Sequence, residues 1–209
     1  MTNLVKLFRL AELMRSQPQY GYALAGIPKD ELSDLAQHHY LVAFIAWQLA
    51  ANLNAKGAKL NVEKVLELAL VHDLGELLGG DISMPYARAN PKARKLAKNF
   101  EKENLVYLSK FFGLQAAAFR KAGDEIMEPK TDEGLVAKIA DYVEATHYKL
   151  YMGRLSEGDI HMAEKGLHSK IAKFKDAVAK KEMAEFIVAW GQDLLAARGK
   201  EFFESSKNL

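Results

Sequence analysis

The chain has 209 residues, and 49% of them are apolar, so it is long enough and apolar enough to bury the core of one ordinary domain. Its 29 basic and 27 acidic residues nearly balance, which gives no case for general electrostatic binding to nucleic acid. The chain has no cysteine, which excludes disulfides, zinc–thiolate sites and a cysteine nucleophile.

The first fifteen residues mix apolar and basic side chains at helical spacing and predict an amphipathic helix. They contain neither the continuous apolar stretch nor the small-residue cleavage site of a signal peptide. The longest apolar stretch, 41–53, is interrupted by Gln48 and Asn52 and is shorter than the roughly 20 residues that cross a bilayer. We therefore expect a cytoplasmic protein that engages neither a membrane nor nucleic acid.

Helical periodicity continues through almost every later segment. In chain order, helices are expected over residues 35–53, 62–78, 93–112, 114–127, 131–152, 164–180 and 182–198. Asn61 is placed to cap the second of these helices, and Gly79-Gly80 to end it. A polar loop with Pro85 and Pro91 is expected to follow.

The pattern along the chain indicates a single fold class. It contains no alternating strand pattern of useful length, no glycine-rich phosphate loop after a strand and no internal repeat. We expect one all-α domain over 1–209, whose motif-bearing core covers about 20–150 and whose C-terminal helices, 155–205, pack on that core.

The pair His72-Asp73 follows the apolar run 68–71. An ionised carboxylate in a packed core is costly unless it is paired or coordinated. His38 lies 34 residues upstream of His72, and Asp141 lies 68 residues downstream of Asp73, each on another expected helix. A lone histidine such as His38 is usually a capping or surface residue, and a His-Asp pair alone carries little information. The ordered set on three helices instead predicts one metal ion, and its mixed nitrogen and oxygen donors suit Mn²⁺, Fe²⁺, Co²⁺, Ni²⁺ or Zn²⁺.

Two acidic residues follow closely enough to act at the same site. Glu76 is expected one helical turn beyond His72, where it can serve as general base or acid for a water activated by the metal. Asp81 follows the Gly79-Gly80 break and can fold back over the site.

These residues resemble the H…HD…D signature of the HD-domain superfamily of metal-dependent phosphohydrolases, and within it the small 5′-nucleotidase-like branch. The branch motif H-D-x-x-E-x-x-x-x-D is matched at 72–81 and the motif K-x-A-D at 138–141, in a resemblance covering about 20–150. It implies an HD-type helical bundle and a homodimer. It also implies metal ligation by His38, His72, Asp73 and Asp141, catalysis by Glu76 and Asp81, and substrate contact by Asp81.

The chain departs from the branch where substrate phosphate should be held. Gln37 and His39 replace the acidic residue and the serine that usually flank the first histidine, and no arginine stands in the stretch 18–28. We expect the phosphate to be held by Arg88, with His39 and Lys92 as further candidates and Arg15 as a weaker one. The basic cluster Lys92, Arg94, Lys95 and Lys98 could attract a phosphorylated substrate, or it could be a solvated helix face.

The combined prediction is a metal-dependent phosphohydrolase acting on a small phosphate ester, with a nucleoside monophosphate as the expected substrate. The alternative is an HD-fold binding or regulatory protein with a metal site and little turnover, which the missing arginine favours and the intact Glu76 and Asp81 oppose. Homodimer formation is also favoured by the apolar segments 4–14 and 186–195, whose apolar surface exceeds what one core is expected to cover.

Overall fold

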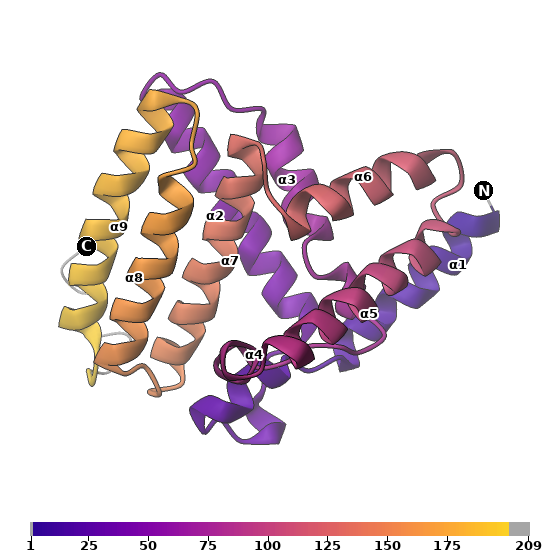
Figure 1. The fold of residues 1–209 in the computed structure, drawn as a ribbon, viewed down its shortest axis with the longest axis horizontal. Helices are drawn as coiled ribbons and strands as arrows, with labels where there is room; N and C mark the ends of the chain where they lie inside the picture. Colours follow the sequence, from indigo (N-terminus) through magenta and orange to yellow (C-terminus); the bar gives the residue numbers. More distant parts are fainter. Residues whose placement is uncertain (1, 201–209) are drawn as a thin grey trace.

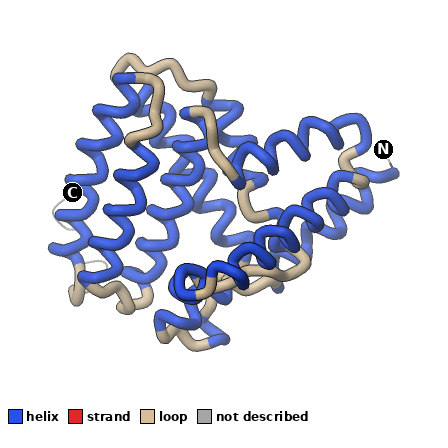
Figure 2. The backbone as a smooth tube through the Cα atoms, in the orientation of Figure 1, coloured by secondary structure: helices blue, strands red, loops and turns tan. Residues whose placement is uncertain are grey.

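The computed structural model describes residues 2–200, which contain helices and loops but no strand (Figures 1 and 2). The α-helices are α1 (Thr2–Ala11), α2 (Leu35–Ala55), α3 (Val62–Val71), α4 (Met84–Ala89), α5 (Pro91–Ser109), α6 (Ala116–Met127), α7 (Asp132–Tyr151), α8 (Glu157–Ile171) and α9 (Ala177–Ala197). Short 3-10 helices cover Glu12–Ser16, Tyr20–Ala25, Lys29–Glu31, Leu74–Glu76 and Gly113–Gln115. The predicted all-α fold is confirmed, and no helix of this part of the chain is long and apolar enough to cross a bilayer.

The centre of the fold is formed by α2, α3 and α7, which pack directly on one another. Small buried residues such as Ala46 of α2 and Ala140 of α7 let these helices approach closely. Helices α8 and α9 pack on this centre through α7 and α2, so α7, α8 and α9 stand side by side in Figure 1. Helix α5 crosses beside them and contacts α4, α6 and the turn after α3. This arrangement brings segments that carry the predicted ligands to one place.

The predicted helix over 62–78 is wrong in its extent, because α3 ends at Val71. Asp73 has φ −121° and ψ 17°, outside the helical range, and a short 3-10 helix follows. Asn104 of α5 holds this turn by donating to the carbonyl of Gly75 at 2.7 Å. A Cβ at position 75 would lie 2.8 Å from the backbone oxygen of Glu101, so the close approach of α5 requires glycine there. The turn is therefore set by a contact between distant segments.

Three other predicted boundaries also differ. The expected loop after Asp81 contains α4, with Pro85 in its first turn. Helix α8 begins at 157 and not at 164, because Ser156 and Asp159 form a capping box. The predicted helix over 164–180 is broken at 172–176, where Asp176 accepts from the backbone amides that begin α9.

Candidate metal centre and active-site cavity

His38 lies in the first turns of α2 and is almost fully buried. Its Nδ1 lies 2.5 Å from Oε2 of Glu144 on α7, and the same oxygen accepts from the Tyr22 hydroxyl at 3.3 Å. Since the carboxylate is the acceptor of both contacts, we assign the ring proton of His38 to Nδ1. The other ring nitrogen, Nε2, then presents a lone pair to the space between α2, α3 and α7.

His72 stands immediately after the last residue of α3 and is also buried. Its Nδ1 lies 2.6 Å from the carbonyl oxygen of Ala69, which can only accept, so this nitrogen carries the proton. Its Nε2 therefore carries a lone pair as well, and this atom lies 3.0 Å from Nε2 of His38. Burial would lower the pKa of His38, but Asp141, Asp73 and Glu144 outweigh it and raise that pKa well above its ordinary value, so this position favours positive charge, as a proton or as a metal ion.

Asp73 and Asp141 complete the cluster. Oδ2 of Asp73 lies 3.4 Å from Nε2 of His38 and 3.3 Å from Nε2 of His72, and Oδ1 of Asp141 lies 3.5 Å from Nε2 of His38. One donor atom from each of the four residues lies within 4.8 Å of the others. The convergence of two lone-pair imidazole nitrogens and two carboxylates fits a divalent metal ion with mixed nitrogen and oxygen ligands. The structure thus brings the four predicted ligands together.

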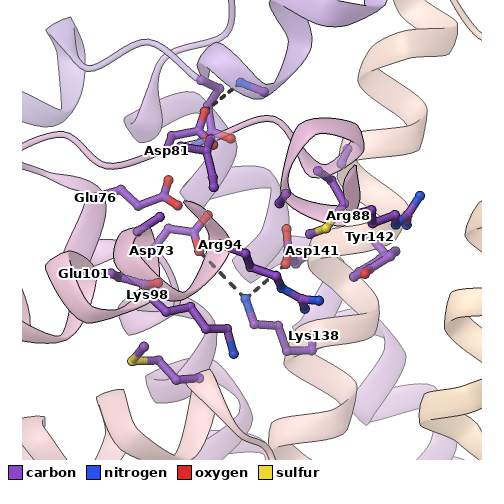
Figure 3. A pocket seen from close by; sticks show the side chains of 18 of the residues that line it. Asp73, Glu76, Asp81, Arg88, Arg94, Lys98, Glu101, Lys138, Asp141 and Tyr142 are labelled. Atoms are coloured by element: carbon purple, nitrogen blue, oxygen red, sulfur yellow. Dashed lines mark hydrogen bonds and ion pairs between the residues drawn. The ribbon is translucent and has the colours of Figure 1, made fainter. Parts of the chain in front are cut away.

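Lys138, one turn before Asp141 on α7, supports the two carboxylates. Its Nζ lies 3.2 Å from Asp141 and 3.8 Å from Asp73, as the dashed lines in Figure 3 mark. Burial would raise the pKa of Asp73, but His72 and Lys138 outweigh it and hold that pKa well below its ordinary value. Burial would likewise raise the pKa of Asp141, and Lys138 reverses the shift. Both groups are therefore held as carboxylates, which is the form that binds metal.

Glu76 and Asp81 lie on the same side of the site as Asp73 (Figure 3). Glu76 ends the 3-10 turn after α3, and burial together with the charges of Asp73 and Asp81 raises its pKa well above the ordinary value. Asp81 accepts from the backbone amide of Gly21 at 2.7 Å, and burial raises its pKa. This contact joins the loop after Gly79-Gly80 to the turn at Tyr20–Ala25, so Asp81 does fold back as expected.

These groups open into a cavity of about 760 Å³ between α5, α7 and α8, a size that suits a small-molecule ligand. Among the predicted phosphate contacts, Arg88 of α4 lines this cavity, whereas His39, Lys92 and Arg15 do not. His39 is buried against His72, with ring centroids 4.6 Å apart, and its Nε2 has no hydrogen-bond partner in the described part of the chain.

Sequence reasoning missed two acidic residues at the site. Glu144, which holds His38, was detectable only as a polar residue one turn after Asp141 on an apolar helix. Glu101 of α5 lines the cavity, and burial and the charge of Asp73 raise its pKa to about 7. Nothing in the sequence near Glu101 indicated that its side of α5 faces the site.

Comparison with known proteins agrees with this geometry. The HD domain family model matches residues 12–190, so the chain belongs to the HD-domain family. It is 34% identical over 101 residues to a 5′-deoxynucleotidase of Vibrio cholerae, an alignment covering 48% of this chain and 45% of that protein. It is 29% identical over 148 residues to a 5′-deoxynucleotidase of Vibrio vulnificus, covering 68% of this chain and 74% of that protein.

Two solved structures are similar in fold. A conserved hypothetical protein of Pyrococcus furiosus is 26% identical with a TM-score of 0.63, over 88% of this chain and 99% of that one. The PH0347 protein of Pyrococcus horikoshii is 23% identical with a TM-score of 0.67, over 90% of this chain and 98% of that one. The predicted HD family is confirmed by the family model, and the curated relatives that the chain matches are named 5′-deoxynucleotidases.

Proposed function

We propose that this chain is a metal-dependent phosphohydrolase that removes phosphate from nucleoside monophosphates. One observation carries the proposal. The Nε2 atoms of His38 and His72 lie 3.0 Å apart at the end of a cavity, and the carboxylates of Asp73 and Asp141 lie beside them. The relatives named 5′-deoxynucleotidases support a nucleotide as the substrate.

In this proposal, one ion of Mn²⁺, Co²⁺, Fe²⁺, Ni²⁺ or Zn²⁺ is held by His38, His72, Asp73 and Asp141. When bound, a divalent metal lowers the pKa of water and withdraws charge from a phosphoryl oxygen. Glu144 and the Ala69 carbonyl keep both imidazole rings turned toward that position by fixing the protons on Nδ1.

Glu76 is the proposed proton carrier. Burial and the charges of Asp73 and Asp81 raise its pKa well above the ordinary value, so this carboxyl group holds a proton more readily than a free glutamate does. It shares the site with Asp73 without being one of the four clustered donors. Asp81 is proposed to help catalysis and to contact the substrate from the loop after Gly79-Gly80, where its Oδ2 accepts from the backbone amide of Gly21.

Arg88 is the strongest of the phosphate contacts expected from the sequence, because it lines the cavity from α4. His39 and Lys92 are weaker proposals, since neither reaches the cavity in this structure.

The proposal is tested by incubating purified protein with a panel of nucleoside and deoxynucleoside monophosphates and sugar phosphates in the presence of each metal, and measuring released phosphate. Turnover of a nucleoside monophosphate that stops on chelation supports the proposal. If metal binds stoichiometrically and no ester turns over, the alternative of a binding or regulatory HD protein replaces it.

We further propose that the protein works in the cytoplasm as a homodimer. The support is an exposed apolar face on α2, where Tyr40, Phe44 and Trp47 are 71%, 49% and 45% exposed. In the predicted segment 186–195, by contrast, Ile187, Trp190 and Leu194 are buried in the core. Light scattering at micromolar concentration that gives the mass of one chain would reject the dimer.

A further inference from the structure

The basic side chains of the cavity differ in whether another group already engages them. Lys138 pairs with two of the predicted metal ligands, Lys149 pairs with Asp159 at 2.9 Å, and Arg88 donates to Met162. The remaining basic residues of the lining have no carboxylate within ion-pair distance in residues 2–200: they are Arg94, Lys98, Lys130, Lys170 and Lys173. A cavity lined by several basic side chains that make no ion pair is suited to an anionic ligand.

The rotation of α5 decides which of its basic residues reach the cavity. Arg94, Lys98 and Glu101 follow each other at intervals of four and three residues, so they share one face, and all three line the cavity. Lys95 lies on the same helix and does not line it. Figure 3 labels Arg94 among the side chains that line the cavity, together with Lys138 and Asp141. The basic cluster seen in the sequence is therefore divided between cavity and solvent.

Lys170 approaches from α8 on the other wall. Its Nζ lies 4.3 Å from the centre of the Tyr142 ring, which packs against α8 where Gly166 leaves room. Burial lowers the pKa of Lys170, and the nearby charges of Lys138, Lys173 and Arg94 lower it further, while Asp141 opposes them. Lys170 and Arg94 thus line the same cavity from two walls, and neither has a carboxylate within ion-pair distance among residues 2–200.

We propose that Arg94 and Lys170 form a clamp that holds the reacting phosphate group of the substrate beside Asp141. The inference rests on the proposed function and names two phosphate-binding residues that the sequence motifs did not identify. A phosphate dianion needs cations whose charge is not already neutralised, and Lys138 is occupied by Asp73 and Asp141. The planar guanidinium of Arg94 can bind two phosphate oxygens, and the ammonium of Lys170 supplies a point charge from the opposite side.

The test uses Arg94→Gln and Lys170→Met in the full-length, metal-loaded protein. Methionine keeps an unbranched apolar side chain over Tyr142 and removes only the charge. Calorimetric titration with inorganic phosphate, the product of the proposed reaction, should give a Kd about tenfold or more higher in each variant, since hydrogen bonds to charged groups are the stronger ones. KM for the substrate should rise by a similar factor, with a smaller fall in kcat.

Matched controls come from the same helices. Lys95→Gln on α5 and Lys165→Met on α8 remove charges that do not line the cavity, so both should leave the phosphate Kd and KM unchanged. A wild-type protein that binds no phosphate at millimolar concentration, or variants with unchanged Kd and KM, would overturn the clamp.

Two outcomes separate the clamp from the proposed function. If no ester turns over but phosphate binding is lost in Arg94→Gln and Lys170→Met, the proposed function fails, while Arg94 and Lys170 remain the residues that bind phosphate in this cavity. If both variants raise KM only for a substrate with a second phosphate, such as a nucleoside 3′,5′-bisphosphate, they hold a distal group and the clamp on the reacting phosphate is overturned.

Discussion

Replacing Glu144 by glutamine tests whether this buried carboxylate positions His38 for metal binding. The residue is 2% exposed, and its Oε2 lies 2.5 Å from Nδ1 of His38. Glutamine has nearly the same shape and its carbonyl can still accept from His38, so the ring should keep its place while losing a charged partner. The Glu144→Gln substitution therefore tests the negative charge of Glu144 separately from its shape.

The expected magnitude follows from the strength of that hydrogen bond. A hydrogen bond to a charged group contributes about 1.5–3 kcal/mol and a neutral one about 0.5–1.5 kcal/mol. Their difference, about 1–1.5 kcal/mol, corresponds to roughly a tenfold weaker metal Kd, which lies at the low end of the 10- to 100-fold effects seen for groups that orient metal ligands. Glu144→Ala should cost more, because it also leaves His38 and Tyr22 without their acceptor.

The assay is competition for Mn²⁺ or Zn²⁺ against a chromophoric chelator, with thermal unfolding measured in parallel. Glu128→Gln is the matched control, because Glu128 is an exposed acidic residue of the same cavity. An unchanged metal affinity in Glu144→Gln and Glu144→Ala would refute the reasoning that Glu144 orients a metal-bound His38.

Three further predictions concern the segment after α3. Asp73→Ala should lose the metal, which elemental analysis should find at close to one per chain in the wild type; full retention would remove Asp73 from the ligands. Glu76→Gln should keep the metal and lose about 10²-fold or more in kcat, as expected for a proton-transfer group; unchanged turnover would point to another base. Gly75→Ala should lower the free energy of unfolding by about 1–3 kcal/mol, because its Cβ would collide with Glu101. Denaturant unfolding measures this, and Gly158→Ala, whose Cβ meets only Ser156 at 3.8 Å, should show no such loss.

Local signals predicted some elements closely. The helix expected over 131–152 is α7, Asp132–Tyr151, because Thr131 caps it and Gly153, with φ 64°, follows its end. The clustering of the four predicted ligands was also predictable, since His38, His72-Asp73 and Asp141 lie on three segments expected to pack together. Their convergence needed only that three apolar helices pack together.

The remaining features depend on contacts that the sequence does not encode locally. The end of α3 is set by the approach of Asn104 and Glu101 to Gly75, across more than 25 residues of chain. Which basic residues of α5 face the cavity depends on how that helix is rotated against its neighbours. A helix with charged residues on several sides carries no periodic signal for that rotation, so Arg94 and Lys95 look alike in the sequence.

The position of the four proposed metal ligands has a consequence for how long the protein survives in a cell. They come from α2, from the residues just after α3 and from α7, the three helices that make up the centre of the core. An ion bound there joins the central helices of the fold, so its binding free energy adds to global stability, by about 2.7 kcal/mol at a free metal concentration 100-fold above Kd. Metal scarcity would then raise the unfolded fraction available to proteases, and the abundance of this protein would follow the metal supply of the cell.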